Sequence, residues 1–253
     1  MIYIVGAIMG HYKLAAKFAF LAVFFLSVTA AQSGQFNINP VRIYLDGKTR
    51  SGTVVVENMG DEVLTVQAMM NSWTQEDGKD DLIVPTDDLI VSPPIFKVQP
   101  QSRQTVRVAN LKKPDARLEG AYRLYLQEVP PPRRPDEPGM SVAVRMSLPI
   151  FITPTDVKTQ AVLKWKAYPV DDKNINLVLA NSGNAHIQIT GISISLPDAS
   201  SLATIPSMMK YILPGRAHTF KIKIDKPWNG EPLRVMIKSD TAPPGVETEI
   251  KPE

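Results

Sequence analysis

Beyond residue 31 the chain alternates apolar and polar residues with a period of two, which is the period of a half-buried β-strand. The alternating segments are rich in β-branched residues and are separated by turn signals such as Asp46-Gly47. They predict strands at residues 38–45, 53–58, 64–73, 95–98, 105–109, 121–129 and 140–152. Seven strands within about 120 residues is the strand count of an immunoglobulin-like sandwich.

A second series of alternating segments follows a short polar stretch, residues 155–160, which suits a hinge between domains. It predicts strands at residues 161–166, 175–180, 185–195, 219–224 and 233–238. The proline-containing tail from Thr241 is predicted to fray. We therefore predict an all-β protein with two sandwich domains, residues 32–154 and residues 155–253, joined by a short hinge.

The first 31 residues have the three-part layout of a secretory signal. Two lysines precede an eleven-residue apolar run, and small residues follow it. The run is short of the ~20 residues that a membrane-spanning helix needs, so stable membrane insertion is the weaker interpretation. We expect export from the cytoplasm and cleavage near Ala30 or Ala31. A start at Met9 instead of Met1 would still leave a complete signal.

Removal of this segment changes the charge balance. It takes away two of the 28 Lys and Arg residues and none of the 25 Asp and Glu residues, which leaves 26 against 25. Without an excess of positive charge, the exported chain lacks the electrostatic footprint of a nucleic-acid-binding protein. The chain has no cysteine, which excludes disulfide bonds, thiol catalysis and zinc sites with cysteine ligands.

The sequence shows no constellation typical of a catalytic or metal site. His186 and His218 are the two histidines beyond the signal, and neither has an acidic residue at metal-ligand spacing. Residues 191–195 lack the second glycine of a nucleophile elbow, and the acidic stretch 76–81 lacks the spacing of a calcium loop. We therefore expect no enzyme activity, no metal and no cofactor, and we interpret both histidines as solvated or core residues.

The segment at residues 140–152 is longer than an ordinary strand. At ~3.3 Å per residue it would span ~43 Å, against ~17–20 Å for a usual strand. Pro149 removes one N–H donor and favours an edge position. Either the apolar face of this strand is wholly buried in its own sandwich, or part of it stays available to another protein. Its apolar positions are Met140, Val142, Val144, Met146, Leu148, Ile150 and Ile152.

Six segments, in this order and spacing, carry a resemblance to a known family. They are residues 38–47 (INPVRIYLDG), 92–94 (SPP), 122–131 (YRLYLQEVPP), 147–154 (SLPIFITP), 177–184 (LVLANSGN) and 212–215 (ILPG). The chain resembles the periplasmic pilus-assembly (fimbrial) chaperones of the chaperone-usher family, which are PapD-like. The resemblance implies two immunoglobulin-like domains set at an angle, a periplasmic location, and binding of pilin or fimbrial subunits that are delivered to an outer-membrane usher.

In this family the chaperone lends a strand to a subunit that lacks one of its own. Carried over to this chain, the resemblance implies that Met140, Val142, Val144 and Met146 fill the open groove of the subunit. Because such a strand keeps an exposed edge, we also expect weak self-association of the free protein.

The resemblance further implies that Arg42 binds the C-terminal carboxylate of the subunit, through the two-pronged donor geometry of a guanidinium group. The family's partner lysine falls at Pro149 in this sequence, and proline cannot bind a carboxylate. We therefore expect Arg42 to act alone or with a second base. Arg123 and Arg145 are the candidates, without support from the family.

Three more residues take interdomain or structural roles from the resemblance: Glu128, Arg107 and Pro93. The interdomain ion pair of many members keeps Glu128, but Thr153 stands where an arginine is usual. Together with Pro149, this departure indicates a divergent branch of the family, of the archaic type.

Two other functional classes stay open on the sequence. A structural or adhesive surface protein with immunoglobulin-like domains, such as a pilus subunit, would share the strand pattern. A pilin, however, would be a single incomplete domain with an N-terminal donor extension. An enzyme or small-ligand binder would need site residues that the sequence does not display.

Overall fold

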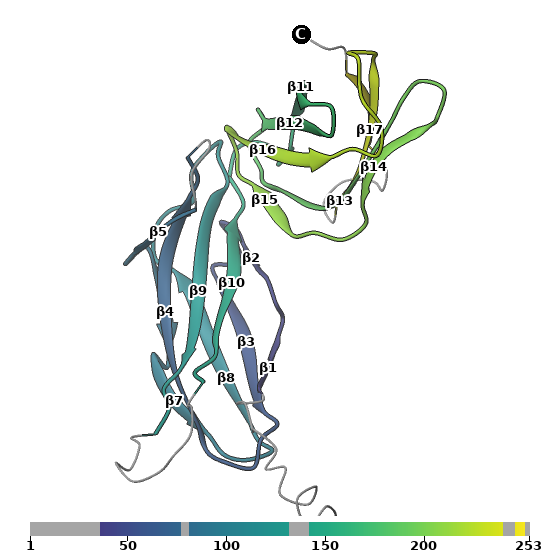
Figure 1. Ribbon diagram of the computed structural model, residues 1–253. Helices are drawn as coiled ribbons and strands as arrows, with labels where there is room; N and C mark the ends of the chain where they lie inside the picture. Colours follow the sequence, from purple (N-terminus) through teal and green to yellow (C-terminus); the bar gives the residue numbers. More distant parts are fainter. Residues whose placement is uncertain (1–35, 77–80, 132–141, 240–245, 251–253) are drawn as a thin grey trace, which may run out of the picture.

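The computed structural model describes residues 36–76, 81–131, 142–239 and 246–250, and these residues form only strands, turns and loops (Figure 1). The predicted all-β class is therefore confirmed. None of the described segments forms a helix long and apolar enough to cross a membrane. The expected signal, residues 1–31, lies outside the described residues.

The strands up to residue 152 form the first sandwich. One sheet has the order β1-β3-β8-β6, with β1 Phe36–Asn39, β3 Ser51–Asn58, β8 Arg103–Asn110 and β6 Leu89–Ser92. The other has the order β2-β10-β9-β4-β5, and β7 also pairs with β4. Its strands are β2 Ile43–Leu45, β10 Arg145–Ile152, β9 Gly120–Glu128, β4 Leu64–Thr74, β5 Leu82–Pro85 and β7 Ile95–Val98.

The segment predicted as one strand at residues 38–45 is two strands in different sheets. β1 pairs antiparallel with β3, and β2 pairs parallel with β10. Pro40 lies directly after β1 and has no N–H to continue a ladder, so pairing stops there and the chain crosses to the opposite sheet. This crossing brings residues 40–42 to the end of the sandwich that faces the second domain.

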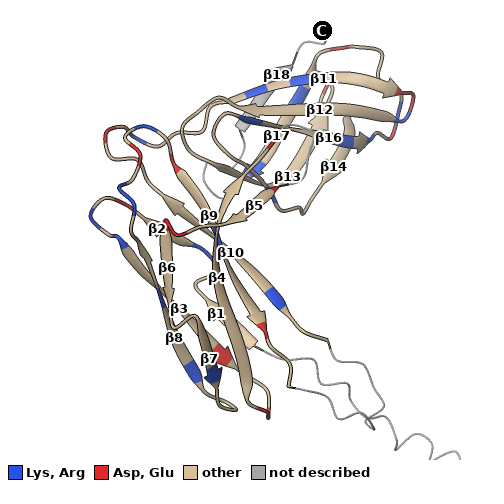
Figure 2. Cartoon of the chain, turned by 90° about the vertical axis from the view of Figure 1, so that its left-hand side faces the viewer, with Lys and Arg blue, Asp and Glu red and all other residues tan. Residues whose placement is uncertain are grey.

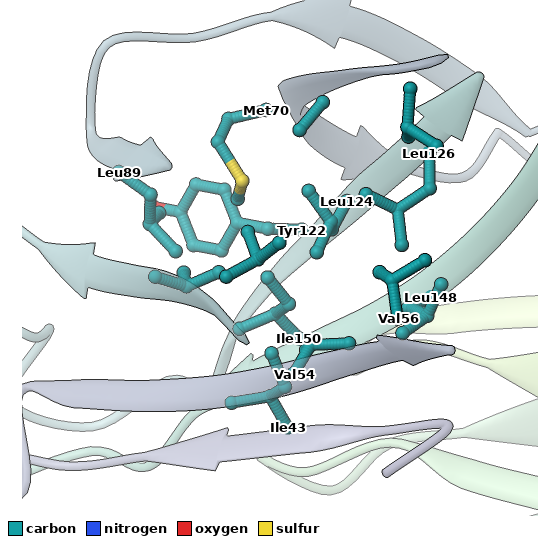
Figure 3. Packing of buried hydrophobic residues seen from close by; sticks show 14 of the residues in the cluster. Ile43, Val54, Val56, Met70, Leu89, Tyr122, Leu124, Leu126, Leu148 and Ile150 are labelled. Carbon is teal, nitrogen blue, oxygen red and sulfur yellow. The ribbon is translucent and has the colours of Figure 1, made fainter. Parts of the chain in front are cut away.

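The core of the first sandwich lies between the two sheets (Figure 3). Val54 and Val56 of β3 face Leu124 of β9 and Ile150 of β10, and all four side chains are fully buried. Each such burial contributes roughly 1.5–3 kcal/mol, so the alternating inward positions of the strands hold the two sheets together. The inward alternation along β10 thus fixes which of its side chains belong to this core.

The strands from residue 163 onward form the second sandwich. A three-stranded sheet has the order β11-β12-β16, with β11 Leu163–Asp171, β12 Asn174–Asn181 and β16 Arg216–Lys223. The facing sheet has the order β14-β13-β17-β18, and β15 also pairs with β13. Its strands are β14 Ser201–Ile205, β13 Ile187–Ser195, β17 Leu233–Ser239, β18 Val246–Ile250 and β15 Lys210–Ile212. Isoleucine, leucine and valine side chains fill the core between these sheets.

The motif Asn181-Ser182-Gly183-Asn184 has a structural role. The Asn181 side chain accepts from Gly183 N–H and Val162 N–H and donates to the carbonyl oxygens of Ala185 and Ile212. A Cβ atom at Gly183 would lie 2.1 Å from the Gln160 carbonyl oxygen, so only glycine fits this turn. The turn thereby ties the start of the second sandwich to β12 and β15.

The two sandwiches meet at their ends (Figure 1), in a small junction of apolar side chains and hydrogen bonds. Trp73 and Phe151 of the first domain pack against Tyr211 and Leu213 of the second. The amide of Gln75 donates to the Tyr211 carbonyl oxygen at 3.0 Å and accepts from Leu213 N–H at 2.8 Å. These contacts fix how the second domain sits on the ends of β4, β9 and β10.

The structure adds strands that the sequence did not predict. β5, β6, β14 and β15 are only three to five residues long, too short for a visible alternation. The expectation that the tail frays from Thr241 is wrong for residues 246–250, because β18 pairs antiparallel with β17.

Candidate functional site

The outer edge of β10 is only partly covered. β10 pairs with β9 along its whole length, whereas β2 pairs with it only from Ile150 onward. Among the described residues, no strand lies on this side of β10 before Ile150. Glu128 N–H donates to the Val144 carbonyl oxygen at 2.9 Å, and bonding alternates along antiparallel strands, so the N–H groups of Arg145 and Ser147 point to the open side. β10 therefore presents an unpaired edge at which another strand can add.

The apolar side chains of β10 become more exposed toward its N-terminal end. Leu148 is buried, Met146 and Val144 are half-buried at the margin of the core, and Val142 is 59% exposed. The interpretation that the whole apolar face is buried in its own sandwich is therefore wrong for Val142, Val144 and Met146. Met140 lies outside the described residues.

β10 is shorter than the strand that the sequence predicts. The alternation starts at Met140, but in the described part of the chain the strand begins at Arg145. On the neighbouring β9, Glu128 is the last residue, and two prolines follow at residues 130–131. Proline has no N–H, so this ladder cannot continue. The Glu128 carboxylate instead accepts the Val144 N–H at 3.1 Å.

Glu128 consequently lies far from the second domain. β9 starts at the junction, where Gly120 stands opposite Ile152, and ends at Glu128. The expectation that Glu128 takes part in an interdomain ion pair is therefore wrong. Arg107 is exposed on β8 in the opposite sheet, and Pro93 lies between β6 and β7. Neither residue is at the junction, and their structural roles stay predictions.

Arg42 lies at the domain junction, in the bend between β1 and β2. Its guanidinium donates to the Tyr44 hydroxyl at 2.8 Å and to Gln188 Oε1, in the second domain, at 2.6 Å. Its central carbon is 5.4 Å from the ring centre of Tyr211, also in the second domain. Arg42 therefore faces the space between the domains and contacts both.

Arg123 reaches the same place from β9. It is the direct cross-strand neighbour of Pro149 on β10. Its guanidinium carbon stacks 3.6 Å above the Trp73 ring and lies 5.5 Å from the ring centre of Tyr211. Burial lowers the pKa of this guanidinium, and the nearby Asp81 acts in the opposite direction. Arg42 and Arg123 thus converge on one tyrosine ring, and a guanidinium stays charged at neutral pH even with a lowered pKa.

Arg145 is separate from these two arginines. It pairs with Gln127 near the far end of β9, and its guanidinium carbon lies 4.1 Å above the Tyr125 ring. Three residues of β10 lie between Arg145 and Pro149, which is the cross-strand neighbour of Arg123. The structure therefore brings Arg123, and not Arg145, to Arg42.

Sequence reasoning missed the residues that the second domain contributes. Gln188 and Tyr211 contact Arg42, and His186, interpreted from the sequence as a solvated or core residue, is buried and pairs with Glu119 across the junction. His186 and Glu119 are separated by 67 residues, so no local pattern could reveal this pair. The one local signal was that Gln188 lies between the apolar residues Ile187 and Ile189, which indicates that its side chain faces away from its own core.

The charges and side chains of the site suit the binding of a peptide. Lys and Arg residues are interspersed with Asp and Glu residues over both domains (Figure 2). Within the described ranges, no three His, Asp or Glu side chains gather as metal ligands would. The site combines a hydrogen-bonding edge, a row of apolar side chains and two guanidinium groups, which together suit an extended peptide with a free carboxylate.

Comparison with known proteins gives a family for the first domain. Residues 35–158 match the family described as pili and flagellar-assembly chaperone, PapD N-terminal domain. The chain is also 24% identical, over 147 residues, to the probable fimbrial chaperone LpfB of Escherichia coli O157:H7. That alignment covers 56% of this chain and spans 60% of the relative's length.

Solved structures share the fold of both domains. The chaperone of the CsuC-CsuE complex, described as a chaperone-tip adhesion subunit pre-assembly complex of archaic Csu pili from Acinetobacter baumannii, gives a TM-score of 0.64 at 20% identity over 87% of this chain and 99% of the other. The E. coli chaperone DraB gives a TM-score of 0.59 at 15% identity over 88% and 98%. The N-terminal domain thus matches the family of PapD-type pilus-assembly chaperones, and both domains share the fold of these solved chaperones.

Proposed function

We propose that this protein is a periplasmic chaperone that binds incomplete pilin or fimbrial subunits by adding β10 to their sheet and delivers them to an outer-membrane usher. The observation that carries the proposal is the unpaired edge of β10 beside half-buried Val144 and Met146 and exposed Val142. A subunit that lacks a strand offers the complementary edge and an open apolar groove. Structural relatives described in complexes with tip adhesin subunits support this kind of partner.

The energetics require more than the apolar row. Full burial of a Val or Met side chain contributes roughly 1.5–3 kcal/mol, and Val142, Val144 and Met146 begin at different exposures. Association costs about 4–15 kcal/mol. Ladder hydrogen bonds at about 0.5–1.5 kcal/mol each, and a charge-assisted contact at about 1.5–3 kcal/mol, supply the remainder. Binding that depends on several modest contributions is stable and still allows the subunit to be exchanged.

The charge-assisted contact is proposed to come from Arg42 and Arg123 together. Arg123 stands beside Pro149, so it places a guanidinium on β9 where β10 cannot supply a base. The two guanidinium carbons lie 5.4 and 5.5 Å from the centre of the Tyr211 ring, so two charged donor groups stand near the same part of the junction. The C-terminal carboxylate of the subunit is the proposed ligand. Arg145, on the exposed face of β10, would contact the body of the subunit instead.

The remaining assignments belong to the same proposal. Residues 1–31 are a signal removed near Ala30 or Ala31, residues 32–154 are the chaperone domain, and residues 155–253 are the second immunoglobulin-like domain. The protein acts in the periplasm, needs no cofactor, and catalyses no reaction. Its similarity in fold to a chaperone of archaic pili favours an archaic-type pilus system. A structural or adhesive role, the alternative on sequence, is favoured by no contact in the described residues.

The experiment is co-expression of the chain with a candidate pilin in the periplasm, followed by purification on a tag carried by the chaperone. We expect a one-to-one complex that protects the pilin from proteolysis. Val142→Asp with Val144→Asp should abolish the complex, because two carboxylates would enter the apolar groove. The matched control is Val170→Asp, at a similarly exposed valine of the second domain. Full binding by the double variant would rule out the strand-donation mechanism.

A further inference from the structure

A buried imidazole–carboxylate pair joins the two domains. His186 Nδ1 lies 2.6 Å from Glu119 Oε2, and the same oxygen accepts the His186 backbone N–H at 2.8 Å. The His186 side chain is 3% exposed and that of Glu119 is 4% exposed. Glu119 lies directly before β9 of the first domain, and His186 lies directly before β13 of the second. The contact therefore crosses the hinge.

The His186 ring is also held from its face. It stacks on Phe151 of β10 with a centroid distance of 3.4 Å and an interplanar angle of 6°. Phe151 is fully buried and follows, two residues later, the Pro149 position that faces Arg123. The first domain thus holds the His186 side chain of the second domain by a hydrogen bond and by ring stacking. Both contacts come from β10 or from the start of its neighbour β9.

The same face of the second domain carries the partner of Arg42. Ile187 and Ile189 of β13 point into their own core, so His186 and Gln188 both face the first domain. Gln188 accepts the Arg42 hydrogen bond at 2.6 Å. Any rotation of the second domain that moves His186 from Glu119 also moves Gln188 from Arg42. The position of the Arg42 guanidinium therefore depends on the contact between His186 and Glu119.

We propose that Glu119 and His186 form an interdomain clamp whose role is to position the carboxylate anchor, so that His186 is a positioning residue for Arg42. The inference rests on the proposed function for its ligand, the C-terminal carboxylate of a subunit. Domains joined by a short hinge move relative to each other unless their interface prevents it. A buried polar pair is costly to break once one partner is removed, so it selects one arrangement of the domains. It does so in a chain whose Glu128 lies away from the junction.

Other polar groups around the clamp fit a positioning role. Glu119 N–H donates to the Asn184 carbonyl oxygen of the second domain at 3.0 Å. The titratable rings that face His186 are Tyr44 of β2 and Tyr211 of β15, at 6.2 and 5.9 Å between centroids. Both rings also lie within 6 Å of the Arg42 guanidinium carbon. The clamp and the anchor therefore share the same aromatic walls.

The first test concerns the free protein and does not depend on any subunit. His186→Phe keeps the stack on Phe151 and removes the hydrogen bond, whereas Glu119→Gln keeps the volume and removes the charge. Residual dipolar couplings and small-angle scattering report the distribution of angles between the domains. We expect one orientation in the wild type and a broader distribution in both variants. His218→Phe, at a half-buried histidine on β16, is the matched control and should leave the orientation unchanged.

The second test measures two forms of one synthetic peptide that copies the last strand and C-terminus of a candidate pilin. One form ends in a free carboxylate and the other in an amide. We expect wild type to prefer the carboxylate by at least about tenfold, which is the weak end of a charge-assisted hydrogen bond. We expect His186→Phe and Glu119→Gln to lose this preference while still binding the amide form as wild type does. A purely structural role would weaken both forms equally.

A double variant, Glu119→Gln with His186→Phe, completes the cycle. We expect it to be no worse than either single variant, because the two residues act as one unit. Additive losses, or an unchanged orientation and preference in both single variants, would overturn the clamp. If His186→Phe does not fold, the domain orientation and the carboxylate preference of Glu119→Gln test the clamp in its place. If wild type binds neither peptide, the proposed function fails, while the orientation measurements still decide the clamp.

Discussion

At the scale of single residues, the proposed anchor depends on Pro149 and on Arg123, its cross-strand neighbour. Pro149 occupies a position on β10 that faces the junction and has no charge to offer. Arg123 stands directly across from it and is held flat by Trp73 at 3.6 Å. Stacking on an aromatic face fixes the plane of a guanidinium while leaving its N–H groups free to bind in the plane. In the proposed anchor, Arg123 on the neighbouring strand takes the place of the base that Pro149 cannot provide.

The residue-scale prediction is that Arg123→Lys does not replace arginine. A lysine cannot stack on Trp73 or donate a fork of hydrogen bonds, so carboxylate-dependent binding should fall by about tenfold or more. Isothermal titration with acid and amide forms of a pilin C-terminal peptide measures this. Arg145→Lys, at the arginine that stacks on Tyr125, is the control and should keep the preference. Equal preference in Arg123→Lys and wild type would remove Arg123 from the anchor.

At the scale of elements, β10 has two different backbone edges. Its even-numbered residues bond to β9, while N–H groups of Arg145 and Ser147 point to the open side. The apolar side chains at its even positions, in contrast, all point toward the core of the first sandwich and lose cover toward the N-terminal end of the strand, whereas Phe151 points to the junction. β10 is thus fixed along its β9 edge and at its C-terminal end, where β2 also pairs with it. Its other edge and its N-terminal end stay open to another strand.

A proline exchange separates the two edges of β10. Ser147→Pro removes an N–H that points outward, so we expect the protein to fold and to lose most of its subunit binding. Met146→Pro removes an N–H that bonds to β9 and leaves a carbonyl oxygen of β9 unpaired, so we expect it to destabilise the first domain by about 1–3 kcal/mol. Thermal unfolding and pull-down of the pilin measure the two effects. Normal subunit binding by folded Ser147→Pro would contradict the edge assignment.

The turns between elements depend on carboxylates. Backbone N–H groups of Thr49 and Lys48 hydrogen-bond to Asp46 and lower its pKa, and those of Arg117 and Leu118 do the same for Asp115. Because these pKa values are lowered on folding, the stabilisation is present above the ordinary value near 3.8 and is lost as pH falls below it.

We therefore expect the melting temperature to drop between about pH 4 and pH 2, in part because Asp46 and Asp115 become protonated. Replacing Asp46 and Asp115 with asparagine should make that drop shallower, since the amide oxygen still accepts and does not titrate. Melting curves of wild type and the double variant across this range provide the measurement. Parallel curves would show that these two turns do not contribute to the acid sensitivity.

At the scale of the whole molecule, the junction decides what the two sandwiches do together. It buries Trp73, Phe151 and Tyr211 beside hydrogen bonds that cross the hinge, among them that of Gln75 with the Tyr211 carbonyl oxygen and that of Glu119 with His186. Such an interface couples the domains without merging their cores, which remain two separate clusters. The junction is therefore a property of the two domains together and of neither domain alone.

The whole-molecule prediction concerns Gln75, whose amide binds the backbone of residues 211 and 213. Gln75→Ala leaves a buried N–H and C=O unpaired, so we expect it to weaken the coupling of the domains by about 1–3 kcal/mol. Calorimetry should then resolve two unfolding transitions where wild type shows a more cooperative one. Gln104→Ala, at a glutamine on β8, is the control and should not separate the transitions.

The sequence by itself determined the longer strands, because alternation with a period of two is a local property that follows from which face of each strand is buried. It also located the motif with Arg42 and the apolar row from Val142 to Met146. It could not determine that residues 38–45 change sheets, since both halves alternate alike and only the partner strands differ.

Only the tertiary structure decided which polar groups meet. The register of β9 against β10 places Arg123 beside Pro149, and the hinge brings Glu119 to His186 over 67 residues. Glu128 was misplaced for the same reason, because a motif fixes a residue along its strand but not which end of that strand faces the second domain. Side-chain pairs at long sequence separation depend on packing of whole sheets, and no local pattern encodes that geometry.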